Sequence, residues 1–277
     1  MNNFNLTVFD VEHGNSIVLK LPNANDDRFL FDIGNRADFS PALHLARNYG
    51  SNIRWLVITH PDTDHISDVE YVSKYLSVNT LSSHDEITTE FLYEYHVDGI
   101  PEIVQKYIEY KKRFNLPAPP IEDPSYDWGG VQFAQFWNTT KDFSDINNLS
   151  ICTFAMFQGW CVLLPGDLEE AGWKKHLESE AFREMLKRTD IYVASHHGRE
   201  NGYCADVFNY CTPHLVIISD KGVSETSCTD KYAAHTYGLK VSNLGTMRKV
   251  LTTRYDGAIN LNIDAEGKYV LKTFSTS

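Results

Sequence analysis

The stretch His60-Pro61-Asp62-Thr63-Asp64-His65 places four side chains of metal-ligand type within six residues. It directly follows the apolar run Trp55-Leu56-Val57-Ile58-Thr59, which has the pattern of a buried strand. A strand that ends in such a cluster brings imidazoles and carboxylates together at the rim of a sheet, where a loop can fold them around divalent cations. The stretch therefore predicts a metal-dependent hydrolase.

Three other predicted strands also end in residues of metal-ligand type. They are followed by Asp10 (after Val8-Phe9), by Asp167 (after Val162–Gly166), and by His196 and His197 (after Ile191–Ser195). Binding sites in layered α/β proteins commonly lie where strand ends meet at one edge. If these ends meet the first cluster, the site holds up to four carboxylates and four imidazoles, which is enough for two cations.

Periodicity and turn residues predict many short strands and fewer helices, and this ratio implies layered sheets with helices outside. The predicted strands are Asn5–Phe9, Ser16–Leu21, Arg28–Asp32, Trp55–Thr59, Val131–Trp137, Ser150–Phe157, Trp160–Pro165, Ile191–Ala194, Leu215–Ser219, Lys249–Thr252 and Ala258–Ile263. The predicted helices are Pro41–Tyr49, Ile66–Tyr75, Ile87–Phe114, Leu168–Leu186 and Ala205–Tyr210.

Length and composition favour one domain, residues 1–277. The chain has 277 residues, of which 42% are hydrophobic, so it can bury a large core. The segment from about 81 to 128 is polar and aromatic and closes with the turn Leu116-Pro117-Ala118-Pro119-Pro120. We expect this segment to be a helical insertion over the core.

Charge and cysteine usage limit the cellular setting and the partners. A formal charge of -12 disfavours a protein that coats nucleic acid non-specifically. The five cysteines form no CxxC pair, and the opening residues lack the basic start and apolar core of a signal peptide. No apolar run approaches the roughly 20 residues that cross a bilayer. We therefore expect a cytoplasmic protein with reduced thiols and no membrane partner.

Taken together and in order, the motifs resemble those of the metallo-β-lactamase superfamily, and most nearly the branch that includes the hydrolase domain of the ComEC/Rec2 DNA-uptake proteins. That branch has DVGxGDS, THxDxDH, NNxS, a Gly-Asp after a strand, HHG and a late Thr-rich Asp-Gly hairpin. The corresponding stretches here are Asp10–Ser16, Thr59–His65, Asn147–Ser150, Gly166-Asp167, His196–Gly198 and Thr252–Gly257. The resemblance implies a four-layer αββα sandwich.

The resemblance also implies roles for individual residues. His60 and Asp62 would bind one metal, and Asp64 and His65 the second. Asp167 would bridge the two metals. His196 or His197 would complete the second site. We expect His196, which comes first after the strand, to be the ligand. His197 would then face substrate or donate a proton, and Asp64 would orient the attacking water while binding metal.

Other residues are expected to support the site. Asp10 would lie below the metals and orient a ligand imidazole. The third histidine of the superfamily pattern is absent, and Asn148 stands in its place. His13 and His235 are candidates to line the pocket. Asn15 occupies a position where the DNA-uptake branch has Asp.

The ligand types bear on the metal and on the reaction. Asp62 replaces the second histidine of HxHxDH, so the first site is harder, and Mn²⁺ or Mg²⁺ competes with Zn²⁺. Two cations about 3.5–4 Å apart would activate water and hold a phosphoryl or carbonyl oxygen. This ligand set makes classical antibiotic hydrolysis a poor expectation.

Each motif also has a purely structural interpretation. Asp62 and Asp64 could cap the helix predicted from Ile66, and Asp167 could cap the helix predicted from Leu168. His196 and His197 could be ordinary loop residues. Helix capping does not account for the histidines that flank the carboxylates, and the joint occurrence in family order favours a metal site.

Three classes of function follow from these patterns. The leading one is a phosphodiesterase or nuclease that acts on nucleic acid or a nucleotide. The second is a hydrolase of a small substrate such as a cyclic nucleotide, a phosphate ester or a lactone. The third is a metal-binding module that works only with a protein partner. Lys111, Lys112 and Arg113 lie in a basic and aromatic run, Gln105–Phe114, that could contact nucleic acid or a partner protein, or form a lid.

Overall fold

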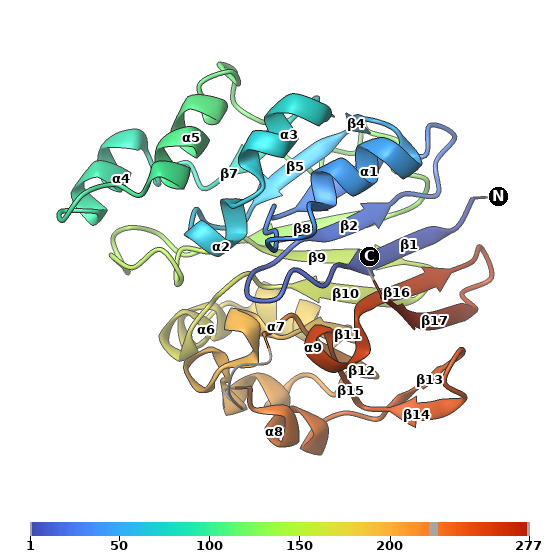
Figure 1. Cartoon of the computed structure of the whole chain (residues 1–277). Helices are drawn as coiled ribbons and strands as arrows, with labels where there is room; N and C mark the ends of the chain where they lie inside the picture. Colours follow the sequence, from blue (N-terminus) through green and yellow to red (C-terminus); the bar gives the residue numbers. More distant parts are fainter. Residues whose placement is uncertain (1, 222–226, 276–277) are drawn as a thin grey trace.

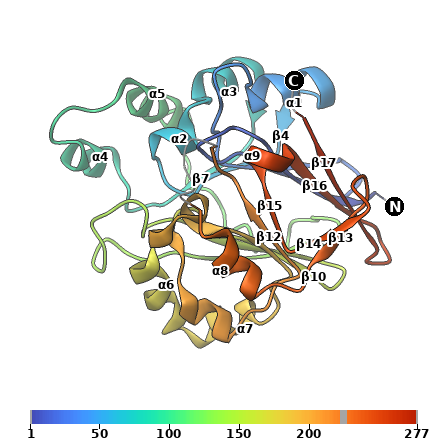
Figure 2. The ribbon, with the colours of Figure 1, turned by 60° about the horizontal axis from the view of Figure 1, so that its bottom comes forward.

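Two β-sheets lie face to face, and helices cover the outer face of each sheet (Figure 1). Figure 2 shows α6, α7 and α8 together on the outer side of one sheet and α1 and α3 on the outer side of the other. This is a computed structural model that describes residues 2–221 and 227–275. The four-layer αββα sandwich expected from the sequence is confirmed.

The larger sheet has nine strands and the smaller has six. In spatial order the larger sheet contains β14 (Thr246–Arg248), β13 (Leu239–Val241), β17 (Tyr269–Phe274), β16 (Ala258–Ile263), β1 (Phe4–Val8), β2 (Ile17–Lys20), β3 (Arg28–Phe31), β5 (Trp55–Ile58) and β7 (Leu81–Ser83). The smaller sheet contains β15 (Val250–Thr252), β12 (Leu215–Ile218), β11 (Ile191–Val193), β10 (Trp160–Leu164), β9 (Cys152–Phe157) and β8 (Gln132–Phe136). A separate short pair is β4 (Asn52–Ile53) with β6 (Ser77–Val78).

Each strand predicted from the sequence is present to within two residues at either end. The strands that the sequence pattern missed include several of two or three residues, such as β7, β13 and β14, which are too short to show an alternation of their own. They form because neighbouring strands supply the hydrogen-bonding partners.

The helices are shorter than the sequence predicted. They are α1 (Pro41–Tyr49), α2 (Thr63–Ile66), α3 (Val69–Tyr75), α4 (Thr89–Tyr95), α5 (Glu102–Lys111), α6 (Glu170–Leu177), α7 (Glu180–Leu186), α8 (Thr229–Ala234) and α9 (Thr253–Asp256). The single helix predicted over Ile87–Phe114 is wrong, because Gly99 has a φ of 115° and Pro101 precedes α5. The helix predicted over Leu168–Leu186 is also two helices, and Ser179 caps the second.

Three further helical segments are short 3₁₀ turns. They are η1 (Ser195–Gly198), η2 (Glu200–Gly202) and η3 (Ala205–Asn209). The last lies where an α-helix was predicted over Ala205–Tyr210.

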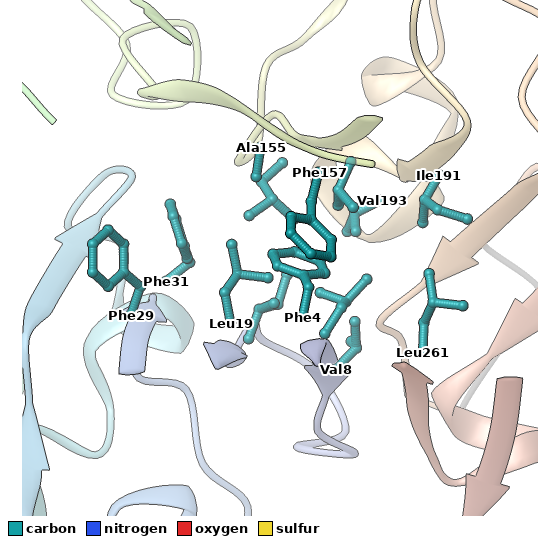
Figure 3. Packing of buried hydrophobic residues seen from close by; sticks show 14 of the residues in the cluster. Phe4, Val8, Leu19, Phe29, Phe31, Ala155, Phe157, Ile191, Val193 and Leu261 are labelled. Atoms are coloured by element: carbon teal, nitrogen blue, oxygen red, sulfur yellow. The ribbon is translucent and has the colours of Figure 1, made fainter. Parts of the chain in front are cut away.

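Apolar side chains from both sheets interlock in the space between them. Along β1, Phe4, Leu6 and Val8 are buried in this core while the residues between them are only partly buried, which is the period-two pattern of a strand. Figure 3 shows Phe4 against Phe157 of the opposite sheet, with their ring centroids 5.8 Å apart. This core fixes how the two sheets are aligned.

The segment from about 81 to 128 is joined to the rest of the protein at several places. Its first residues form β7, which pairs in parallel with β5, so the helical part begins after Ser83. Tyr107 of α5 is buried in the outer layer, and α5 packs against α2 and α3. Trp128 lies in the core between the sheets, 5.0 Å from the ring of Phe29. The segment therefore holds α5 beside the helix that carries Asp64 and His65.

The strand ends that carry ligand-type residues meet at one edge of the sandwich. β3 and β5 run parallel in the larger sheet, and β10, β11 and β12 run parallel in the smaller one, so their carboxyl ends lie at the same side.

Within the described residues, no helix is long and apolar enough to cross a membrane.

Candidate metal centre

The chain turns sharply into the site immediately after β5, at the cluster His60–His65. Thr59 and His60 follow the strand, and α2 begins at Thr63. Asp62 occupies the N-cap position of α2, but its side chain makes no capping hydrogen bond, and Asp64 lies inside the helix. Helix capping therefore does not explain these two carboxylates.

The turn into α2 packs tightly against two glycines. A Cβ atom at Gly14 would lie 2.4 Å from the backbone oxygen of Asp64, and one at Gly34 would lie 2.5 Å from the same atom. Gly14 also has a φ of 134°, which disfavours any other residue. The sequence thus lets α2 approach the larger sheet closely enough to aim Asp64 at the opposite loops.

A first group of ligand atoms comes from both sheets. His60, His65 and Asp167 each offer an atom within 4.8 Å of the others. Nε2 of His65 lies 3.2 Å from Oδ1 of Asp167, and Nε2 of His60 lies 3.7 Å from Oδ2 of Asp62. The structure brings together His60 and Asp62, which were expected at the first metal, and it places His65, which was expected at the second, in the same group, with ring centroids of His60 and His65 4.2 Å apart.

A second group lies on the other side of Asp167. Nε2 of His197 is 3.1 Å from Oδ2 of Asp64 and 3.3 Å from Oδ2 of Asp167. His13 joins this group, with its Nε2 3.3 Å from Oδ2 of Asp64. Asp167 therefore turns one carboxylate oxygen toward His65 and the other toward His197, which is the shape expected of a bridging ligand.

The backbone of η1 places His197, and not His196, nearer the carboxylates. Both residues have left-handed φ values, 49° and 55°, and Gly198 follows with 71°. Left-handed non-glycine residues store strain and often mark functional loops. The turn aims His197 at the carboxylates, whereas Nε2 of His196 stays 4.0 Å from Asp167 and its Nδ1 lies 3.4 Å from Oε1 of Glu169.

Contacts at the opposite ring nitrogens orient the imidazoles. Nδ1 of His65 is 2.8 Å from Oδ2 of Asp32, and Nδ1 of His197 is 3.0 Å from the backbone oxygen of Ser219. Nδ1 of His60 is 3.3 Å from Oγ of Ser150. A histidine held at one nitrogen presents the other to a metal, so these contacts direct the Nε2 atoms inward.

Asp10 does not have the role expected from the sequence. Its carboxylate accepts from Nη1 of Arg36 at 2.6 Å and from the backbone N–H of Glu12. Asp32 orients the ligand imidazole instead. The available signal was the strand Arg28–Phe31, which ends directly before Asp32 in the same way that other strands end before ligand residues.

Asn148 is also placed differently from the expectation. Its Oδ1 accepts from the backbone N–H groups of Glu169 and Gly172, at 3.0 and 2.9 Å. Both acceptor directions of that oxygen are therefore used at the start of α6. The Asn148 side chain thus holds the start of α6 in place.

The remaining candidates lie away from the converging atoms. His235 stacks on Phe208, with ring centroids 4.6 Å apart. Nζ of Lys111 donates to the backbone oxygen of Ile87, and Lys112 pairs with Glu109. The guanidinium of Arg113 lies over the ring of Tyr110. Lys111, Lys112 and Arg113 thus point to different partners and form no continuous basic strip.

Burial and mutual charge shift the pKa values of the central groups. Burial alone would raise the pKa of the Asp64 and Asp167 carboxyls, but the facing imidazoles of His65 and His197 hold both well below their usual range. Burial alone would lower the pKa of His197, but Asp167 and Asp64 raise it to about 9. The carboxylates therefore attract positive charge into the space between the sheets.

Burial lowers the pKa of His13 to about 4, with His197 adding to the effect, and burial also lowers the pKa of His196. These two histidines are neutral near pH 7. They can accept hydrogen bonds and protons at the open side of the site.

The donor set fits a divalent cation. The Nε2 atoms of His60, His65 and His197 are buried and face carboxylate oxygens, with no other hydrogen-bond partner among the described residues. Buried polar atoms of this kind are normally satisfied, so three imidazole nitrogens in one place fit the coordination of a cation. Imidazole nitrogens and carboxylate oxygens in this mixture suit Zn²⁺, Mn²⁺ and related ions.

Comparisons with known proteins agree with this geometry. Residues 9–142 match the sequence model of a family described as the Metallo-beta-lactamase superfamily. No curated protein matches the chain. Among solved structures, the metallo-beta-lactamase fold protein YhfI from Bacillus subtilis is 10% identical, with a TM-score of 0.50 over 92% of this chain and 98% of that one.

Two further structures have TM-scores of 0.49. Igni18, described as a metallo hydrolase from the archaeon Ignicoccus hospitalis, is 12% identical over 98% of this chain and all of its own. A diphosphatase from the PhnP family is 14% identical over 91% of this chain and 85% of its own. At these identities, structural likeness is informative about the fold alone.

Proposed function

We propose that this chain, which has the metallo-β-lactamase fold and matches that superfamily over residues 9–142, is a phosphodiesterase that uses two divalent cations. The observation that carries the proposal is the position of Asp167. Its two oxygens face different imidazoles, those of His65 and His197, so one carboxylate can serve two cations at once.

The ligand types favour hard or borderline cations. His60, Asp62 and His65 would hold the first ion, and Asp64 and His197 the second, with Asp167 shared. The carboxylate at Asp62 makes Mn²⁺ or Mg²⁺ competitive with Zn²⁺ at the first position. The native metal is therefore best identified by measurement of bound ions.

The protein groups around the cations have separate tasks. When bound, the two cations would supply an activated water and would stabilise the charge that builds up on a phosphoryl oxygen. Asp64 has one carboxylate oxygen near His13 and His197 on the partly open side, where it can orient the attacking water. His196 lies at the edge of the ligand group, and its neutral imidazole can take up a proton and pass it to the leaving oxygen.

A nucleotide or nucleic acid is the substrate class that we propose for this site. Its phosphodiester carries the oxygens that two cations can hold. A long polymer would also need protein contacts along its phosphate backbone. Lys111, Lys112 and Arg113 point to different partners, so they do not form a continuous basic surface for such a polymer. This arrangement favours a short or small diester over a long duplex.

A second candidate is a module that acts with a protein partner. The segment around α4 exposes large apolar side chains: Tyr93 is 59% exposed, Val97 83% and Leu116 80%. Exposed apolar groups that gather in one segment can mark a docking surface. In this case the metal centre would be complete, but turnover would require the partner.

The decisive experiment combines metal analysis with a substrate panel. Purified protein is assayed for bound Zn, Mn and Mg, and then for hydrolysis of single- and double-stranded DNA, RNA, a cyclic dinucleotide and bis-p-nitrophenyl phosphate. Asp64→Ala serves as the inactive control and Asp142→Asn, on the surface, as the neutral one. Diester cleavage that Asp64→Ala abolishes would support the proposal. Two bound metals without turnover of any diester would contradict it and favour the partner-dependent module.

A further inference from the structure

Arg199 comes directly after the His-His-Gly turn and reaches across the open side of the metal centre. Its Nη2 donates to Nε2 of His13 at 2.9 Å, and its Nη1 lies 3.5 Å from Nε2 of His196. His13 belongs to the loop after β1 in the larger sheet, whereas Arg199 follows β11 in the smaller one. The pair therefore spans the two sheets beside Asp64, whose Oδ2 is 3.3 Å from the same His13 nitrogen.

The contacts of Arg199 differ from those of the cations on neighbouring loops. Arg36 pairs with Asp10, Lys221 with Glu12, and Arg254 with Asp220. Within residues 2–221 and 227–275, by contrast, the ion pairs include none between Arg199 and a carboxylate, and its guanidinium contacts are imidazoles. A partly buried guanidinium that has no carboxylate partner within the described residues is available to bind another anion.

The charge balance of the site also indicates that Arg199 is available to bind an anion. Four carboxylates face the ligand imidazoles: Asp32, Asp62, Asp64 and Asp167. Two divalent cations would balance these four negative charges. Arg199 makes no ion pair with any of these four carboxylates, so its guanidinium would be available to an anionic substrate at the side of the site where His13 is partly exposed.

We propose that Arg199, held in place by His13, is a specificity-determining residue that binds a non-bridging phosphoryl oxygen of the substrate and of the phosphomonoester product. This inference rests on the proposed function and narrows it to anionic phosphate esters, as opposed to neutral esters or lactones. The guanidinium offers several N–H donors in one plane, which matches a phosphoryl group better than an ammonium does.

The test measures binding of inorganic phosphate to the metal-loaded protein by calorimetry, which needs no turnover. Arg199→Gln should weaken phosphate binding about 10- to 100-fold, the range for a hydrogen bond to a charged group. Arg199→Lys should recover part of this loss, because the charge remains while the planar donor set is lost. Arg188→Gln is the control, because Arg188 is exposed near the opposite ends of the strands and should leave binding unchanged.

A second measurement works on the unmodified protein and covers the case in which Arg199→Gln does not fold. Phenylglyoxal labels accessible arginines, and mass spectrometry locates the labelled residue. Saturating phosphate should slow labelling of Arg199 several-fold and leave Arg188 unaffected.

Two results would overturn the inference: phosphate binding that is equal in Arg199→Gln and wild type, or labelling of Arg199 that phosphate does not slow. These results can be told apart from failure of the proposed function. If no diester is turned over but phosphate binding depends on Arg199, the anion site stands and the assigned reaction fails. If diesters are cleaved but phosphate binding does not depend on Arg199, the proposed reaction is supported and the proposed anion site is wrong.

Discussion

Nδ1 of His65 lies 2.8 Å from Oδ2 of Asp32, and neither side chain has any solvent exposure. The other oxygen of Asp32 accepts from the backbone N–H and the hydroxyl of Thr59, at 2.8 and 3.0 Å. One buried carboxylate thus fixes both the ring of His65 and the end of the strand that delivers His60. The metal centre depends on a residue that is not itself among the ligands.

Asp32→Asn should weaken metal binding about 10- to 100-fold, the usual effect of removing a partner that orients a ligand imidazole. The new amide would turn an N–H group toward His65 and Asn15, both of which now face an oxygen. Competition with a chelating indicator measures the affinity. Asp10→Asn is the matched control and should have no effect on affinity, since Asp10 contacts Arg36 and no ligand imidazole. An equal loss in both variants would show that overall charge, and not orientation, is responsible.

Asp167→Asn should reduce the bound metal from two ions to one or fewer per chain and lower hydrolysis at least about 1,000-fold. The reason is that the amide nitrogen replaces one of the two oxygens that face His65 and His197. Elemental analysis and initial rates on bis-p-nitrophenyl phosphate measure the two effects. Full metal content with turnover within tenfold of wild type would rule out the bridging role.

His197→Gln and His196→Gln form a matched pair of variants that distinguishes a metal ligand from a residue that only lies beside the metal site. We expect His197→Gln to lose the second metal, because its Nε2 faces Asp64 and Asp167. His196→Gln should keep both metals and show slower turnover, because only the proton carrier is lost. Metal stoichiometry measured in both proteins decides the question. The opposite pattern would restore the order that the chain position suggested.

His176 should make stability fall in mild acid. It is buried in α6 against the ring of Phe182, and burial lowers its pKa to about 4 from an ordinary 6.5. Between these two values the unfolded chain binds a proton that the folded chain does not, so stability is lost as the pH falls through this window.

His176→Phe removes that proton while keeping a ring against Phe182. The free energy of unfolding of wild type minus that of the variant should therefore fall by up to about 3 kcal/mol between pH 8 and pH 4. Urea unfolding at several pH values measures the difference, and other acid-sensitive groups cancel because both proteins contain them. A difference that does not change with pH would mean that His176 takes up its proton normally in the folded state.

Local sequence was enough to predict layered sheets with helices outside and most of the strands, and the family resemblance added the four-layer sandwich. The buried residues of β1, β2 and β5 are apolar, and their pattern is visible within each strand. The cluster His60–His65 was equally visible, because its ligand residues are adjacent in the chain. Helix boundaries were less predictable, since Gly99, Pro101 and Ser179 divide segments whose apolar pattern continues across the break.

Only the tertiary structure decided which groups contact and orient the side chains at the centre. The partner of His65 lies 33 residues away at Asp32, and the partner of Asn148 is the start of α6. The closer approach of His197 than of His196 to the carboxylates follows from left-handed φ values in a turn between two packed sheets. Such contacts depend on distances between remote strand ends. The sequence by itself therefore determined the ligand types and the layers that carry them, while packing of the sheets determined how each ring is aimed.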